Sequence, residues 1–472
     1  MPDHEGGRRD ALDGATGDDD ERGEVKTTDL VTFSRPAMVS TLAEVGLMLD
    51  EAKTLLVRLQ ASMLCAQVAE YAAHHRVCAA CGMLQSFKDR RTRRLQTLFG
   101  TVEVEAPRFK LCRCRLSAPM AKVTVSPVCA LLTAQCTPEL ERVQAELGAR
   151  TSFREAARIL DTLLPASPAN QESVRTRTHA VALRIEAADR QAATEVMAVR
   201  NELDKAAVAD EHRPIVMLDG AYIRAAPGRQ VRNFEAICGK VEHEGHSTRR
   251  FALVRSVAEQ PHALLRAALQ DQGWREGGLV TVISDGDPAL PALVRSATGG
   301  PVEPILDWFH LSMRVHHVEQ VMGGLCALEP PPLVPLDQAR IDVERLPHLL
   351  WNGHHEKACE TLGRIASWAK EAIVLNNPAM EAKARRLVAR CMELQAYIEN
   401  NKDALIDYGQ RHRASKPIST SRAEGTINQL VNARMNKRRQ MRWSPRGAHR
   451  VLQVRAAVLD GRFGHQALQL AA

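Results

Sequence analysis

Two aspartates follow the same local pattern, and that pattern indicates metal chemistry. Asp219 follows the apolar run 214–218, Asp285 closely follows the run 279–283, and a glycine comes directly after each acid. Such runs predict buried strands, and open α/β sheets bind ligands at the carboxyl ends of their strands. Two carboxylates side by side there repel each other unless a cation such as Mg²⁺ lies between them. The alternatives are two ordinary Asp-Gly turns, or Asp287 in place of Asp285.

Glu424 is the candidate for a third acid. It lies near the start of a predicted helix, on the same face as Ile427 and Val431, and this spacing places it on the buried side. Ser421 stands three residues earlier, so Glu424 could instead complete a capping box. Glu424 is the only acid between residues 411 and 445, which a surface cap would not require.

Four cysteines form two close pairs that are typical of zinc ligands. Cys78 and Cys81 have the spacing of a thiolate knuckle, and Cys112 and Cys114 stand one residue closer together than the usual pair. An alternating stretch at 98–104 predicts a hairpin between the pairs. We expect one structural Zn²⁺, with His74 and His75 as substitute ligands; the alternative is four unliganded thiols.

The segments that must position the acids predict an α/β layer. Short apolar runs at 214–218, 233–241, 250–257, 279–283 and 304–306 predict strands, and helical patterns occupy 261–272 and the segment that follows Asp287. Helical patterns return from 311 to about 415, and a final helix pair is expected at 421–436 and 445–458.

Two further helical regions precede this layer. Apolar residues recur at helical spacing from about 36 to 75, and residues 137–187 predict three helices with short breaks. A short helix, a tight turn and a second helix rich in basic side chains are typical of a helix-turn-helix. A plain helical bundle explains the same pattern.

Taken together and in order, these motifs resemble a known family. Leu218-Asp219-Gly220, Ile283-Ser284-Asp285-Gly286, Asp307-Trp308-Phe309-His310 and Ser421-Arg422-Ala423-Glu424-Gly425 resemble the motifs of DDE transposases of bacterial insertion sequences. The similarity is to the ISKra type, which is related to the mutator-like transposases. It extends over residues 75–460.

The resemblance implies a mechanism and a fold. Asp219, Asp285 and Glu424 would hold two Mg²⁺ (or Mn²⁺) ions for cleavage and strand transfer at phosphorus, and His310 would support the site near the scissile phosphate. The implied fold is an RNase H-like α/β catalytic core, a mixed sheet flanked by helices, with an all-helical insertion and N-terminal zinc-binding and DNA-binding modules. The implied partner is double-stranded DNA, at the transposon ends and the target, bound by a homodimer on paired ends.

The predicted organisation has seven parts. They are a disordered acidic tail (1–30), an N-terminal helical region (31–76), a zinc-ribbon-like module (77–136), helix-turn-helix-like DNA-binding helices (137–205), the first part of the core (206–312), the helical insertion (313–415) and the C-terminal core helices with a basic patch (416–472).

The charge distribution favours a polyanionic partner. The formal net charge is +7 although residues 1–25 carry nine acids and three arginines, and residues 411–462 carry thirteen Lys or Arg and two acids. Such a patch neutralises phosphates with little sequence preference. Trp443 either stacks on an unpaired base or lies in the core. The expected DNA contacts are Arg175 and Arg177 for sequence readout and Arg422, Arg434, Lys437, Arg438, Arg439 and Arg442 for the backbone.

Composition excludes several classes of protein. With 45% apolar and 25% charged residues, the chain is neither fibrous nor mostly disordered. It contains no apolar run of about 18 residues and no basic-then-apolar leader. We therefore expect no membrane partner and a cytoplasmic, nucleoid-associated bacterial protein. The competing functions are a structure-selective nuclease or resolvase, and a non-catalytic DNA-binding regulator with a decayed core.

Overall fold

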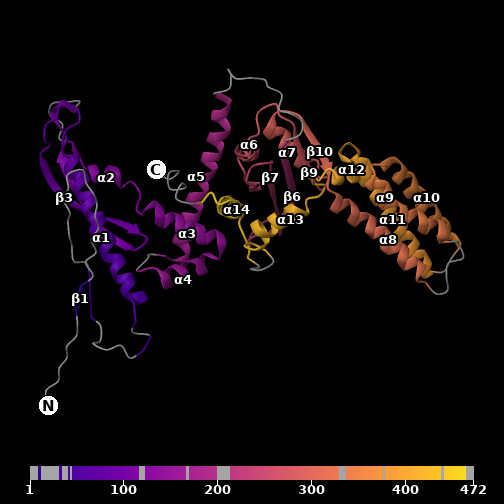
Figure 1. Cartoon of the computed structure of the whole chain (residues 1–472), viewed down its shortest axis with the longest axis horizontal. Helices are drawn as coiled ribbons and strands as arrows, with labels where there is room; N and C mark the ends of the chain where they lie inside the picture. The colour runs from indigo at the N-terminus through magenta and orange to yellow at the C-terminus, as the bar shows by residue number, and fades with distance from the viewer. Residues whose placement is uncertain are drawn as a thin grey trace, which may run out of the picture. The chain divides into compact units, whose positions relative to one another are not determined.

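The chain forms two compact units in the computed structural model, one of residues 1–181 with 464–472 and one of residues 182–463 (Figure 1). The structure describes residues 9–11, 31–34, 41–42, 45–115, 123–165, 169–198, 213–328, 336–375, 378–436 and 441–463. The division falls inside helix α5 (Gln171–Ala198), ahead of residue 206, where the sequence analysis begins the core.

The first unit is built around a three-stranded antiparallel sheet. Strands β3 (Phe87–Thr97) and β4 (Gly100–Lys110) form a long hairpin, and β5 (Thr124–Val125) pairs with the end of β4. Helix α1 (Leu49–His74) and the short α2 (Pro127–Leu131) bury Val102, Val104 and Ala106 of β4. Helices α3 (Pro138–Arg150) and α4 (Phe153–Leu163) follow, and then α5 begins.

The predicted hairpin between the cysteine pairs is confirmed, with its turn at residues 98–99, where the Thr97 hydroxyl donates to the Gly100 carbonyl at 2.7 Å. Two other sequence predictions in this unit need correction. The predicted helix at 36–75 begins only at Leu49. Most of the acidic tail 1–30 lies outside the described residues, but residues 9–11 form a strand, β1 (Arg9–Ala11), paired with β2 (Thr32–Ser34).

The second unit contains a five-stranded mixed sheet with the order β10-β9-β6-β7-β8. Strands β6 (Ile215–Arg224), β7 (Asn233–Glu242) and β8 (Arg249–Val254) form an antiparallel meander, whereas β9 (Val280–Ser284) and β10 (Val302–Leu306) run parallel to β6. These five strands lie at the five predicted positions. The predicted mixed sheet flanked by helices is therefore confirmed.

Alternating apolar residues give the sheet two covered faces. Val216 and Leu218 of β6 pack with helices α6 (Pro261–Asp271) and α7 (Ala289–Thr298), whereas Met217 between them belongs to the core of the helices that follow β10. Gly239 of β7 lies opposite Leu218, and a Cβ there would come within 2.4 Å of the Met217 carbonyl. The close approach of β6 and β7 therefore requires a glycine at position 239.

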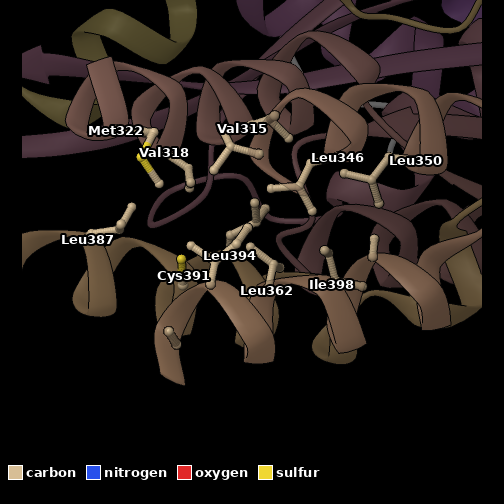
Figure 2. Packing of buried hydrophobic residues seen from close by; sticks show 14 of the residues in the cluster. Val315, Val318, Met322, Leu346, Leu350, Leu362, Leu387, Cys391, Leu394 and Ile398 are labelled. Atoms are coloured by element: carbon tan, nitrogen blue, oxygen red, sulfur yellow. The ribbon is translucent and has the colours of Figure 1, made fainter. Parts of the chain in front are cut away.

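A helical bundle follows the sheet. Its long helices are α8 (Trp308–Cys326), α9 (Asp337–Trp351), α10 (His355–Leu375) and α11 (Pro378–Asn400), and the short α12 (Tyr408–Arg413) comes last. Figure 2 shows Val315 and Met322 of α8 facing Leu387 and Cys391 of α11 across an apolar interface. Because Ile283 of β9 belongs to the same buried cluster, the bundle and the sheet share one core.

The chain returns to the sheet after the bundle. Helix α13 (Ser421–Ile427) continues as one π-helical turn (Asn428–Asn432), and α14 (Pro445–Leu459) packs along the edge strand β8. The predicted helix at 421–436 is thus α-helical only as far as Ile427. Residues 437–440 lie outside the described residues.

Candidate functional site

Asp219 lies on the central strand of the sheet, at the position where one edge of that strand opens. Strand β6 pairs with β9 only from Ile215 to Met217, so from Asp219 onwards it keeps its partner β7 but has left β9. Such a divergence at a switch point creates a crevice beside the strand. One carboxylate oxygen of Asp219 accepts the Gly220 N–H at 2.7 Å, which fixes the orientation of the side chain.

Asp285 follows the neighbouring parallel strand and lies in a tightly held turn. Its carboxylate accepts the backbone N–H of Asp287 at 3.2 Å, and its carbonyl accepts the Tyr397 hydroxyl at 2.7 Å. Gly286 has a φ of +93°, and a Cβ there would lie 2.8 Å from the Asn401 side-chain oxygen. Both the backbone conformation and the available space therefore demand glycine.

Asp287, the alternative second acid, has a structural role. Its carboxylate accepts the Ala289 N–H at 2.9 Å and so caps the start of α7. Of the two acids in this turn, Asp285 is the one whose charge raises the pKa of Asp219.

The electrostatics of Asp219 show which charged groups surround it. Burial, followed by the negative charges of Asp285 and Asp307, raises the pKa of Asp219 to about 6, against the opposing effects of the Gly220 N–H and His310. Across the strand pair, burial also raises the pKa of Cys238, so a neutral thiol lies opposite Asp219. Two acids that the sequence singled out thus share one electrostatic environment at the sheet edge.

Asp307 makes more contacts between elements than the sequence indicated. It is fully buried, and its carboxylate accepts the Phe309 N–H at 2.8 Å and the Thr420 hydroxyl. His310 Nε2 lies 3.8 Å from the same carboxylate. Asp307 therefore caps α8, links that helix to the segment before α13 and lies beside His310.

Helix α13, which carries Glu424, is held at its start beside the sheet. The Trp308 N–H donates to the Ile418 carbonyl at 3.1 Å, next to the Thr420–Asp307 contact. The helix packs against β6 and β7. Helix α13 already includes Ser421, whose N–H donates to the Ser419 hydroxyl at 3.0 Å. The Ser419 hydroxyl therefore serves the helix start. The Glu424 side chain lies outside the description, so the capping box stays a prediction.

The other end of α13 is held by a buried arginine that the sequence did not single out. Arg455 of α14 donates to the carbonyls of Leu430 (2.8 Å) and Gln429 in the π-helical turn. A π-helical turn leaves carbonyls without their usual partners, and such turns are frequent at functional sites. Only the tertiary structure shows this contact, because Gln429 and Arg455 are 26 residues apart.

The four paired cysteines come together in a cluster that could hold a metal. All four sulfur atoms lie within 4.8 Å of one another, with Cys78 and Cys114 Sγ 3.5 Å apart and Cys81 and Cys112 Sγ 3.4 Å apart. Tetrahedral Zn–S bonds of about 2.3 Å separate sulfurs by roughly 3.8 Å, so the cluster could hold a metal such as zinc. Backbone N–H groups, first that of Ala80, lower the pKa of Cys78 to about 6, which favours the thiolate that a metal requires.

This cluster is distinct from every other group of possible ligands that the structure describes. Within the described residues, no second set of three or more His, Cys or acidic side chains brings its ligand atoms so close. His74 and His75 are not part of the cluster. Both predicted cysteine pairs therefore contribute to the cluster, including Cys112 and Cys114, which stand one residue closer together in the sequence.

Comparison with known proteins gives no assignment. The chain matches no model of a protein family, and no curated protein matches it significantly. Among the described helices, none combines the length and apolar character needed to cross a membrane.

Two of the arginines predicted to contact DNA have structural roles instead. Arg434 is fully buried, with its guanidinium 4.8 Å from the centre of the Trp443 ring. Trp443 is buried as well, which favours its core role. Arg177 of α5 donates to the side chains of Gln144 (2.6 Å) and Gln96, so it joins α5 to α3 and β3. Arg434 is therefore not placed to reach a phosphate or a base, whereas Arg177 is half-buried and engaged in these two hydrogen bonds.

The remaining predicted DNA contacts fall into two groups. Arg442 is exposed, and Arg175 is exposed but paired with Glu172. The Arg422 side chain and residues 437–439 lie outside the description.

Proposed function

We propose that the chain is a DNA transposase of the DDE type, which cleaves DNA at transposon ends and transfers the cut strand. The observation that carries the proposal is the shared position of the acids. Asp219 and Asp285 belong to two neighbouring parallel strands, and α13, the helix of Glu424, packs against the first of these strands. That arrangement brings the elements bearing all three acids to one sheet edge.

The topology of the second unit supports an RNase H-like core. Its sheet has an antiparallel meander of three strands followed by two parallel strands on the other side of the first. This order, with one acid on the first strand and one after the fourth, is what such a core requires. The helices of residues 308–413 occupy the position of the expected insertion.

The residues present fit a site for two Mg²⁺ ions. Backbone N–H groups orient Asp219 and Asp285 through one oxygen each, so the second oxygen of each carboxylate can serve as a hard ligand. When bound, the metal ions would activate water and then a DNA 3′-hydroxyl and stabilise the leaving oxygen of an in-line displacement. We assign to His310, which lies beside Asp307, a place near the scissile phosphate.

The test is metal-dependent cleavage of the DNA that flanks the chain's own gene. We expect nicked and then joined products with Mg²⁺ or Mn²⁺, and we expect Asp219→Asn, Asp285→Asn and Glu424→Gln to abolish cleavage while DNA binding persists. Asp287→Asn is the matched control, because the asparagine oxygen can still accept the Ala289 N–H and only the charge is lost. Near-normal cleavage by one of the three variants would remove that acid from the site.

Two outcomes separate the competing functions. Cleaved products without joined products would identify a nuclease or resolvase on the same core. DNA binding without any metal-dependent nicking would identify a regulator.

A further inference from the structure

An open cleft of about 560 Å³ lies directly beside Asp219, and the proposed chemistry does not account for its lining. It follows the free edge of β6 and is bounded on the other side by the π-helical turn and the residues after it. Its volume falls within the range of roughly 300–1,000 Å³ that is usual for small-ligand sites. Besides Asp219, its lining includes Tyr222, Arg224, Asn428, Asn432 and Asn436.

Tyr222 presents an exposed aromatic ring in this cleft. Its side chain is 70% exposed, whereas its neighbours Ala221 and Ile223 on the opposite face of β6 are buried. The Asn436 side-chain amide donates to the Tyr222 carbonyl at 2.7 Å, so the strand is held in place under the ring. An exposed aromatic ring on a strand that is held in this way offers a face for stacking a base.

Three asparagines at four-residue spacing form the opposite wall. Asn432 Nδ2 donates to Asn428 Oδ1 at 2.7 Å, which sets the orientation of both amides. Uncharged amides carry donors and acceptors that match base edges, whereas phosphates favour cations. Arg224 supplies such a cation, because it is exposed on the same face of β6 as Tyr222.

We infer that this cleft binds one unpaired nucleotide of the DNA strand that is cut at Asp219. Tyr222 stacks on the base, the asparagine wall contacts its polar edge and Arg224 contacts a neighbouring phosphate. The inference rests on the proposed function, because Asp219, which lines the same cleft, is the residue assigned to the cut of that strand.

The test measures binding of the full-length protein to a short single-stranded oligonucleotide with one 2-aminopurine, in Ca²⁺ to prevent cleavage. Stacking on Tyr222 quenches the 2-aminopurine. Tyr222→Ala should remove the quench and weaken binding about 5- to 150-fold, the range that stacking on one aromatic ring supplies. Tyr222→Phe keeps the ring and should bind within about threefold of the wild type. Val231→Ala, at an exposed apolar position outside the cleft lining, should change nothing.

The outcomes distinguish this inference from the proposed function. Wild-type binding and quenching by Tyr222→Ala would overturn the inference, even if the protein cleaves DNA. Tyr222-dependent binding by Asp219→Asn, which cannot cleave, would support it. Free dAMP that competes as well as the oligonucleotide would overturn the assignment to a DNA strand and identify a mononucleotide site. Tyr222-dependent binding by a wild-type protein that never cleaves DNA would support the cleft and reject the transposase.

Discussion

Thr420→Val tests whether the position of α13 depends on the buried Asp307. The substitution keeps the shape of the side chain but removes the hydroxyl that donates to the Asp307 carboxylate. The nearest replacement is His310 Nε2, 3.8 Å away and beyond hydrogen-bond distance. Because Asp307 is fully buried, water cannot easily replace the lost donor. We expect a loss of about 1.5–3 kcal/mol, the usual value of a hydrogen bond to a charged group.

The effect on cleavage should exceed the effect on folding. The segment before α13 is joined to the start of α8 by this hydrogen bond and by the 3.1 Å bond from the Trp308 N–H to Ile418. A displacement of about 1 Å in a reacting group can reduce a rate about 10²-fold. We therefore expect single-turnover cleavage at saturating DNA to fall about 100-fold in Thr420→Val, at a temperature where the variant is folded.

Two further variants complete the experiment. Thr420→Ser keeps the donor and should cleave at close to the wild-type rate. Thr361→Val removes a buried hydroxyl that donates to the Lys357 carbonyl at 2.7 Å in α10, away from the site. It should lower the melting temperature without lowering cleavage per folded molecule. Wild-type cleavage by folded Thr420→Val would refute the link between Asp307 and the position of Glu424.

Four more predictions follow from contacts in the structure. Gly286→Ala should cost about 1–3 kcal/mol in urea unfolding, because its φ of +93° and the nearby Asn401 side chain oppose a Cβ; unchanged stability would contradict the geometry. Arg434→Ala should lower the free energy of unfolding by about 2 kcal/mol or more, because it loses a buried cation–π contact. Arg442→Ala should instead reduce the slope of log DNA affinity against log salt by about 1. A reduced slope in Arg434→Ala and lost stability in Arg442→Ala would restore Arg434 as a DNA contact. Burial raises the pKa of Asp189, so ionisation of this carboxyl disfavours folding. As pH rises through that pKa, Asp189→Asn should therefore gain stability relative to the wild type. A relative loss of stability would contradict the direction of the pKa shift. Purified protein should contain about one zinc per chain by elemental analysis, and a chelator-free sample without zinc would reject the metal site.

The sequence predicts the central runs of β6 and β9 well because these runs are buried. Val216–Leu218 is apolar and Val280–Ile283 is buried throughout, with Thr281 as its polar residue, and an acid follows each run closely. Asp285 follows the end of β9, whereas Asp219 lies within β6, just beyond the residues that pair with β9. The pairing of Cys78 and Cys81 with Cys112 and Cys114 is likewise local enough to read from spacing.

The sequence fails where long-range pairing decides the structure. Strand β3 carries a run of basic residues at 88–94 without an apolar face, and it forms because β4 pairs with it along its length. Arg434 belongs to the basic segment that predicts a phosphate-binding surface, but Trp443 nine residues later covers it. Net charge describes a segment and does not show which side chain points inward.

The roles of Asp287 and Asp307 show a second limit. Both acids follow a strand and precede a helix, so the sequence treats them alike as neighbours of the site. The backbone contacts separate them: Asp287 caps α7 alone, whereas Asp307 also accepts the Thr420 hydroxyl 113 residues further along the chain. A capping residue and a residue that connects three elements therefore have the same local signature.

The contacts at the sheet edge also explain why the helical bundle belongs to the site. Tyr397 of α11 donates to the Asp285 carbonyl at 2.7 Å, and Tyr408 of α12 donates to the Leu306 carbonyl at the end of β10 at 2.8 Å. Asn401, between these tyrosines, fills the space that Gly286 leaves open. Each loop that follows a parallel strand is thus held by a polar side chain from residues 397–408. Because the same residues join the bundle core through Tyr408, the conformation of the Asp285 turn depends on a folded bundle, and disruption of the bundle core would disturb Asp285 without touching it.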